Sequence, residues 1–246
     1  MRLRMTVAYD GSGYAGWQRV ATGVAVQEKI EEALKRIGGQ PAPIEGASRT
    51  DRGVHASGMV AGLDWKHPRM RPMDLRRALN ALLPFDLRIL DVRRAPKGFH
   101  ARFDAKRKLY LYRIQNAPVA DPLRRGVCWH VPHALDLAAM RAAAAAFVGR
   151  HDFSAVAANP GYARASMVRT VRRCEIRKRR DEILFEVEGD GFLYKMVRTM
   201  VGTLVEIGGG RRAADSVAAL LASRDRRRAG KTAPAHGLCL VKVFYR

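Results

Sequence analysis

The sequence predicts an α+β protein in which helices pack on one face of a largely antiparallel sheet. Two observations support this class. Some segments alternate apolar and polar residues, as half-buried strands do, and others place apolar residues three or four positions apart, as helices do. Both kinds of segment recur in each half of the chain. The 246 residues, 48% of them hydrophobic, suffice for one large domain or two small ones with cores.

The first half contains three expected strands and two expected helices. A strand opens the chain, and its alternating residues Leu3, Met5, Val7 and Tyr9 share one face. A helix follows from Val26 and ends at two glycines, because glycine readily adopts the left-handed conformation that closes helices. The remaining elements of this half are a strand over 58–65, a helix over 73–83 and a strand over 87–92.

The second half repeats this mixture of strands and helices. It starts with the strand KLYLYRI and continues with an alanine-rich helix over 138–148. A hairpin over 168–187 turns through RKRRDE, and a strongly apolar helix follows, beginning near Phe192. A short helix over 215–222 and a strand over 238–246 complete the half. The boundary lies near 99–107, which gives domains of 1–104 and 105–246.

Net charge is the strongest signal in the composition. Lysine and arginine total 45 against 23 aspartate and glutamate, a formal charge of +22. A solvated basic surface without a dedicated partner would have the same composition. An excess of this size nevertheless attracts polyanions, and the planar arginine fork matches phosphate oxygens. We therefore expect a nucleic-acid partner.

Compartment and redox state follow from what the chain lacks. No apolar run is long enough to span a bilayer, and the first ten residues lack the apolar core of a signal peptide. The cysteines, Cys128, Cys174 and Cys239, are too far apart for a zinc ribbon and odd in number, which argues against a disulfide framework. We expect a soluble, cytoplasmic protein with reduced thiols and no membrane association.

The segment GSGYAG at 11–16 follows a strand and matches the G-x-G-x-x-G pattern of dinucleotide-binding folds. In those folds the helix begins within the motif, so that its N-terminus meets the pyrophosphate. Here helical spacing begins only near Val26, and the candidate acidic residues, Glu31 and Glu32, lie within that helix. A glycine-rich turn is the better interpretation. The seven histidines form no recognisable ligand pattern, so we expect neither a cofactor nor a metal.

The segment GASRTDRGVHASG, residues 46–58, places one carboxylate between two cations. Asp51 lies two residues after Arg49 and directly before Arg52, among glycines and other small residues. The aspartate can bond turn amides while the arginines bind phosphate. Alternatively, it can be a nucleophile that the cations keep ionised, in a loop that a substrate can approach closely. The residues alone leave both interpretations open.

R-T-D-x-G-V-H-A in this segment, with Y-D-G-x-x-Y-x-G-W-Q before it, closely resembles the tRNA pseudouridine synthase A family. The resemblance covers nearly the whole chain, in order, through NALLP, FHARFDA, the tyrosine of KLYLYRI, GDGFLYKMVRTMVGTLVEIG and AxGLxLxxVxY. Two positions depart from the family pattern: Ser48, where glycine is usual, and Arg52, where alanine is common. Neither lies within the Arg-Thr-Asp core.

The resemblance implies an isomerase that converts uridine to pseudouridine at positions 38, 39 and 40 of the tRNA anticodon stem-loop, without a cofactor. It implies that Asp51 is the catalytic aspartate and Tyr110 the active-site tyrosine, which also stacks on the displaced base. It further implies that Arg198 pairs with the aspartate and that Arg49 contacts the phosphate backbone near the target. The implied architecture is two RRM-like halves that form a basic cleft, assembled as a homodimer.

Two rival functions are distinguishable in principle. A non-catalytic RNA-binding protein would share the charge and the strand order, but it would usually carry the aromatic RNP signature, which these strands lack. A nucleotide-dependent enzyme would use GSGYAG for its cofactor. For the isomerase, the sequence does not distinguish attack of the carboxylate on C6 of the ring from attack on C1′ of the ribose.

Overall fold

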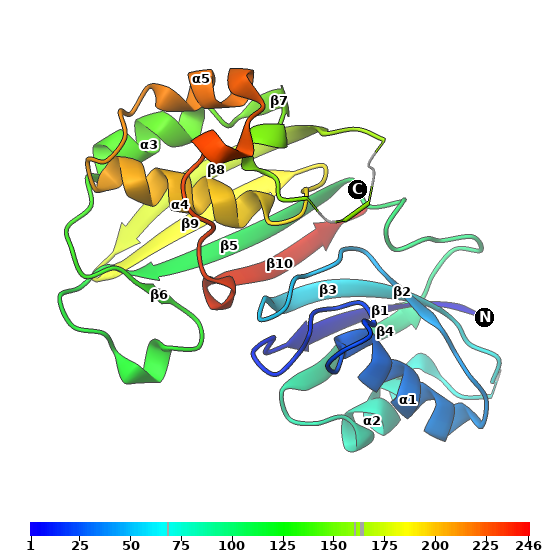
Figure 1. Ribbon diagram of the computed structural model, residues 1–246. Coiled ribbons are helices and arrows are strands. Elements are labelled where there is room, and N and C mark those ends of the chain that lie inside the picture. Colours follow the sequence, from blue (N-terminus) through cyan, green and yellow to red (C-terminus); the bar gives the residue numbers. More distant parts are fainter. Residues whose placement is uncertain (68, 160, 163–164) are drawn as a thin grey trace. The chain divides into compact units, whose positions relative to one another are not determined.

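The computed structural model describes residues 1–67, 69–159, 161–162 and 165–246, and the chain divides into two compact units. The first unit contains Met1–Lys106 together with Cys239–Arg246, and the second contains Arg107–Leu238. In each unit the helices lie on one face of a sheet (Figure 1), so the α+β class is confirmed. The likeness of the halves to RRM domains and the basic cleft stay predictions.

The sheet of the first unit is built around β1 (Arg2–Tyr9), which pairs antiparallel with β3 (His55–Asp64) and with β4 (Leu87–Arg94). The short β2 (Ile44–Gly46) pairs antiparallel with β3, and β10 (Leu238–Phe244) runs parallel to β3. The predicted alternation of β1 is confirmed, since one of its faces is buried by Leu3, Met5, Val7 and Tyr9.

Two helices, α1 (Val26–Gly38) and α2 (Pro72–Leu82), cover this sheet (Figure 1). The glycine stop of α1 is confirmed: Gly39 has a φ of 69°, and its N–H donates to the Lys35 carbonyl at 2.8 Å. Pro72 begins α2, where its missing N–H would have had no partner within the helix. The helices bury one apolar face each, formed by Val26, Ile30, Ala33, Leu34, Leu75 and Leu79.

The sheet of the second unit is antiparallel in the order β5 (Arg107–Gln115), β9 (Glu182–Gly189), β8 (Val168–Arg179) and β7 (Gly149–Asp152). The predicted hairpin is therefore confirmed. A two-residue strand, β6 (Trp129–His130), pairs parallel with the end of β5. The sequence predicted neither β6 nor β7, because strands of two and four residues are too short to show an alternation.

Three helices, α3 (Leu137–Ala145), α4 (Met196–Gly208) and α5 (Ser216–Ser223), cover this second sheet (Figure 1). The predicted start of α4 near Phe192 is wrong. Lys195 directly precedes the helix with a φ of 58°, and a left-handed residue cannot continue a right-handed helix backwards. Phe192 is consequently outside the helix.

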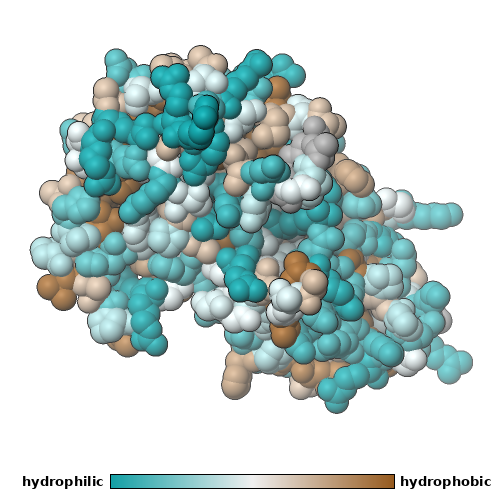
Figure 2. Space-filling view, viewed as in Figure 1, coloured by the Kyte–Doolittle hydropathy of each residue, from teal (hydrophilic) through white to brown (hydrophobic). Residues whose placement is uncertain are grey.

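Hydrophilic side chains cover most of the face of the molecule shown in Figure 2. This agrees with the high content of charged residues, 28% of the chain. In residues 1–67, 69–159, 161–162 and 165–246, no helix has the length and the apolar character that crossing a membrane requires.

Candidate active site

Asp51 lies in the loop that joins β2 to β3, and its neighbour Thr50 anchors this loop. The Thr50 hydroxyl is 2.8 Å from the Tyr9 hydroxyl, and the Thr50 carbonyl accepts a hydrogen bond from the Trp17 N–H at 3.1 Å. Thr50 is buried, whereas Asp51 is half-buried. The threonine therefore fixes the backbone on one side of Asp51 and leaves the carboxylate partly accessible.

A tight turn fixes the other side. The Asp51 carbonyl accepts a hydrogen bond from the Val54 N–H at 3.1 Å, and Gly53 within the turn has a φ of 77°. This is the left-handed region, which glycine adopts without strain. The segment 47–54, here termed the Asp51 loop, is thus restrained on both sides of the aspartate.

The glycines of GSGYAG bring the segment 10–18, here termed the glycine loop, against the Asp51 loop. A Cβ atom on Gly11 would lie 2.1 Å from the Val54 carbonyl oxygen, and one on Gly16 would lie 2.6 Å from the Thr50 carbonyl oxygen. The backbone of the Asp51 loop occupies the space beside these glycines, and α1 begins only at Val26. The glycine loop therefore supports the Asp51 loop, a role that the sequence did not reveal.

His55 joins the glycine loop to the start of β3. Its Nδ1 lies 3.1 Å from the Gly11 nitrogen and 3.1 Å from an Asp10 carboxylate oxygen. Burial raises the pKa of Asp10, but hydrogen bonds from Ser12 and the nearby His55 more than offset that, so the pKa lies below its ordinary value. The charged form of Asp10 is thus favoured at this junction.

The loop between α2 and β4 supports the glycine loop from its other side. The Tyr14 hydroxyl donates to the Asp86 carboxylate at 2.7 Å, and the Asp86 carbonyl accepts from the Asp10 N–H at 2.9 Å. Burial and the bond to Asp86 raise the pKa of the Tyr14 phenol. Asn80, in NALLP, exchanges two hydrogen bonds of 2.8 Å with the backbone of Ile89 and so fixes the base of this loop.

The other predicted residues of the Asp51 loop are more accessible. Arg49 and Arg52 are exposed, and Ser48 is half-buried. A Cβ atom on Gly23 would lie 3.4 Å from an Arg52 guanidinium nitrogen, so the Arg52 side chain lies beside the loop that precedes α1. The two departures from the family pattern, at Ser48 and Arg52, leave the anchors around Thr50 in place.

The second unit carries Tyr110 and Arg198. Tyr110 lies on β5 with 5% of its surface exposed, and the Phe192 ring meets it edge-on, with centroids 5.1 Å apart and planes at 82°. Arg198 lies in the first turn of α4 and is half-buried. Its Nε donates to the Ala233 carbonyl at 2.8 Å, and the Ala233 N–H donates to the Arg198 carbonyl at 3.0 Å.

The segment 230–234 crosses α4 in close backbone contact and thereby positions Arg198. A Cβ atom on Gly202 would lie 1.7 Å from the Lys231 carbonyl oxygen, so only glycine fits at this crossing. The Gly230 N–H donates to the Thr203 hydroxyl at 3.0 Å. A glycine within a helix is the one signal in the sequence that could have indicated such a crossing.

The predicted site residues therefore belong to both units, Asp51 to the first, and Tyr110 and Arg198 to the second. The convergence of the three side chains and the pairing of Arg198 with Asp51 stay predictions. No three His, Cys, Asp or Glu side chains in the part of the chain that the structure describes are grouped as metal ligands.

Comparison with known proteins identifies the family. A family model described as tRNA pseudouridine synthase matches residues 5–104 and 143–246. The tRNA pseudouridine synthase A of Methylacidiphilum infernorum is 44% identical over 243 residues, which cover 98% of this chain and 94% of that protein. Those of Syntrophotalea carbinolica and Myxococcus xanthus are each 45% identical, covering 99% and 100% of this chain and 96% and 92% of theirs. The chain therefore belongs to the tRNA pseudouridine synthase family, isomerases that convert uridine to pseudouridine in tRNA.

Proposed function

We propose that this isomerase acts on uridines 38, 39 and 40 of the anticodon stem-loop, with Asp51 as its nucleophile and without a cofactor. The observation that best supports the proposal is the packing of two family motifs. The glycine loop and the Asp51 loop restrain the backbone on both sides of Asp51 while the aspartate stays half-buried. A nucleophile needs this combination of fixed position and partial access.

The reaction rearranges one nucleotide and transfers nothing to another molecule. The C–N glycosidic bond breaks, the uracil turns, and a C–C bond forms between C1′ and C5. C5 loses its proton and N1 gains one, so the products balance without an oxidant or a leaving group. Asp51 attacks either C6 of the ring or C1′ of the ribose, and in both cases a covalent intermediate divides one difficult step into easier ones.

Tyr110 and Arg198 complete the proposed chemistry. The Tyr110 ring stacks on the displaced uracil, and its phenol assists proton removal from C5. Arg198 pairs with the Asp51 carboxylate and keeps it ionised. Since the Arg198 Nε is bonded to Ala233, this pair would use the terminal Nη atoms of the guanidinium. In this proposal residues 1–104 supply the nucleophile, and residues 105–246 supply the tyrosine and the arginine.

Binding must also extract the uridine from its stack, at a cost of about a few kcal/mol. Phosphate contacts from the basic surface offset that cost, and the exposed Arg49 is the proposed contact nearest the target. We further propose, on the family resemblance, that the protein is a homodimer and acts in the cytoplasm.

Tritium release from tRNA labelled at C5 of uridine tests the reaction and the positions together. Transcripts that carry a labelled uridine at only one of positions 38, 39 and 40 should each release tritium without any added cofactor. A protein that only binds RNA would retain the label, and a nucleotide-dependent enzyme would release it only after its cofactor is added. If tritium is released only from uridines at other positions, the proposed specificity is refuted.

A further inference from the structure

The turn between β8 and β9 carries an open pocket of about 350 Å³, lined by Arg124, Arg179, Arg180, Asp181 and Glu182. We propose that this pocket binds a backbone phosphate of the RNA substrate, at a nucleotide other than the one that is isomerised. The inference rests on the proposed function, since it assigns a second contact to the same RNA.

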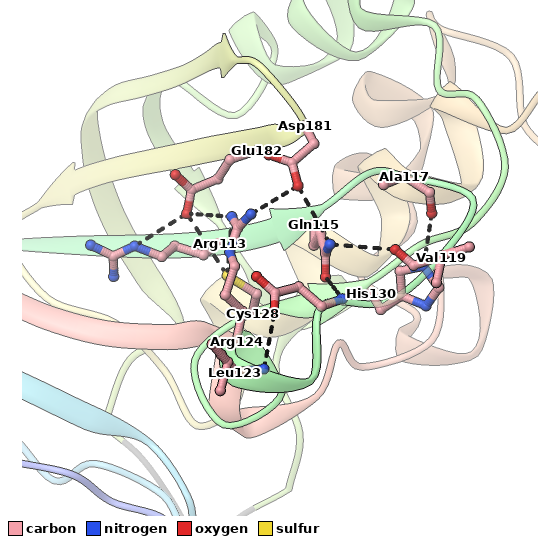
Figure 3. Close-up of polar contacts among 11 residues, drawn as sticks. Arg113, Gln115, Ala117, Val119, Leu123, Arg124, Cys128, His130, Asp181 and Glu182 are labelled. Carbon is pink, nitrogen blue, oxygen red and sulfur yellow. Dashed lines mark hydrogen bonds and ion pairs between the residues drawn. The ribbon is translucent and has the colours of Figure 1, made fainter.

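Arg124 is held in place within the pocket by the two acidic residues. Its guanidinium lies 2.8 Å from the Asp181 carboxylate and 3.3 Å from that of Glu182, and Arg113 lies 3.5 Å from Glu182 (Figure 3). Both carboxylates are therefore neutralised by arginines that already contact them. They do not compete for the two other arginines of the pocket.

Hydrogen bonds to the end of β5 fix the loop that carries Arg124. The Gln115 side chain accepts from the Asp121 N–H at 2.9 Å, and the Asp121 carboxylate accepts from the Leu123 N–H at 2.9 Å. His130 contacts the Ala117 carbonyl at 2.8 Å on the far side of the same loop (Figure 3). Arg124 is thus ordered before a ligand binds, which lowers the entropic cost of binding.

Arg179 and Arg180 supply the excess positive charge. Both are exposed, and neither forms an ion pair with any residue that the structure describes. The residues that line the pocket are three arginines and two carboxylates, a net charge of +1, and Arg113 beside Glu182 raises the local net charge to +2. Guanidinium groups bind phosphate oxygens through paired hydrogen bonds, so an anion of this geometry suits the pocket.

The backbone of Arg180 adopts an uncommon conformation. Arg180 and Asp181 form the two-residue turn of the hairpin, and Arg180 has a φ of 57°. Glycine or asparagine is favoured in this left-handed conformation, whereas arginine is strained. Arg180 lines the pocket from this position.

Strand register separates the pocket from Tyr110. On β5 and β9, Tyr110 pairs with Val187, and Gln115 pairs with Glu182, which lines the pocket. Five residues of extended strand span about 17 Å. The phosphate bound in the pocket therefore belongs to a nucleotide other than the one at Tyr110.

The test compares Arg180→Gly with Arg224→Gly. Arg224 also belongs to the second unit and is left-handed, with a φ of 52°, but lies outside the pocket and pairs with Asp152 at 3.2 Å. Both substitutions remove one positive charge and relieve the same backbone strain. The dissociation constant of an unmodified full-length tRNA transcript is measured from 0.05 to 0.5 M salt, and the melting temperature is measured in parallel.

Arg180→Gly should make the slope of log affinity against log salt shallower by about 0.7–1, because one phosphate contact is lost. If the variant and the wild type bind equally at 1 M salt, a change of about 0.8 in the slope weakens binding about sixfold at 0.1 M salt. Its melting temperature should be equal to or above that of the wild type. Arg224→Gly should leave both the slope and the affinity unchanged. Arg179→Ala should repeat the loss seen with Arg180→Gly.

Equal effects of the two glycine variants would overturn the proposal, because they would reflect net charge alone. An unchanged slope in Arg180→Gly would also overturn it, as would a change of oligomeric state with unaltered RNA binding. The tritium assay keeps the two hypotheses apart. Release by the wild type with no slope change in Arg180→Gly refutes only the pocket. No release, with a slope change specific to Arg180→Gly, refutes only the proposed chemistry.

Discussion

Gly16→Ala tests whether the glycine loop positions Asp51. The added Cβ would lie 2.6 Å from the Thr50 carbonyl oxygen, 3.2 Å from the Asp51 carbonyl carbon and 3.3 Å from the Arg52 nitrogen. Ordinary contacts begin at 3.4 Å, so the Thr50 carbonyl and the added methyl group must separate by about 0.8 Å. All three close atoms belong to the backbone, which cannot relax by a change of rotamer. The displacement therefore moves Asp51 itself.

The expected loss follows from how strictly catalysis depends on position. Productive geometry tolerates about 0.5 Å, and a misplacement of about 1 Å can cost about 100-fold in rate. We expect Gly16→Ala to lower kcat by about 10- to 100-fold, or about 1.4–2.7 kcal/mol of barrier. The φ of 115° at Gly16 adds strain that lowers the free energy of unfolding by about 1–3 kcal/mol.

Two controls separate displacement from strain. Gly39→Ala introduces strain at a φ of 69° in open space, and Gly13→Ala lies in the same loop with its nearest neighbour 3.9 Å away. Gly39→Ala should lose stability but keep kcat, and Gly13→Ala should keep both. Rates come from single-turnover tritium release at saturating enzyme, and stability comes from thermal denaturation. A folded Gly16→Ala enzyme with kcat within twofold of the wild type would refute the reasoning.

Three further predictions concern Asp51, Arg198 and Glu206. Asp51→Asn should lower the rate by about three orders of magnitude or more, because it removes the proposed nucleophile. The tRNA affinity should stay the same or rise, because a negative charge is lost from a basic protein. Pseudouridine formation near the wild-type rate would contradict this prediction. Arg198→Lys keeps the charge but loses the planar guanidinium and the hydrogen bond from Nε to Ala233. We expect kcat to fall about 10- to 100-fold and the tRNA dissociation constant to change less than about threefold. A large change in the dissociation constant with an unaltered kcat would contradict this. Burial raises the pKa of Glu206, but hydrogen bonds from Arg212 and the Lys231 N–H more than offset that effect, so the pKa lies below its ordinary value of 4.5. The charged Glu206 side chain therefore stabilises the folded protein above pH 4.5, and this stabilisation is lost as the pH falls through the pKa of the folded state. Glu206→Gln should therefore lower the melting temperature at pH 7 and narrow its gap to the wild type towards pH 3, whereas a gap independent of pH would count against the linkage.

Local patterns were sufficient where one segment determines its own structure. The helical spacing from Val26 and its glycine stop predicted α1, and the alternation from Leu3 predicted β1. Short elements such as β2 and β6 carry too few residues for a period to be visible. The start of α4 was wrong because Lys195 adopts a conformation that lysine rarely adopts, so the sequence gives no warning of it.

For the site, charge and glycine content singled out the segment around Asp51, but not what holds it. The bond between Tyr9 and Thr50 joins residues 41 positions apart, and that between Tyr14 and Asp86 joins residues 72 apart. Hydrophobic periodicity contains no information about such pairs. GSGYAG was correctly read as a turn, yet its close approach to the Asp51 loop depends on a neighbour that only the folded chain supplies.

The first unit is discontinuous, and this sets the order in which it can be completed during synthesis. Its segments are separated by the 132 residues from Arg107 to Leu238, which take about 7–26 s to translate. Throughout that interval the start of β3 has an unpaired edge, since β2 pairs only with residues 61–63 and β10 pairs with β3 through Cys239–His55 and Leu240–Ala56. β3 begins four residues after Asp51. A nascent chain that stalls within the second unit therefore exposes a strand edge close to Asp51 in sequence, and this edge remains open to mispairing until residues 239–246 emerge.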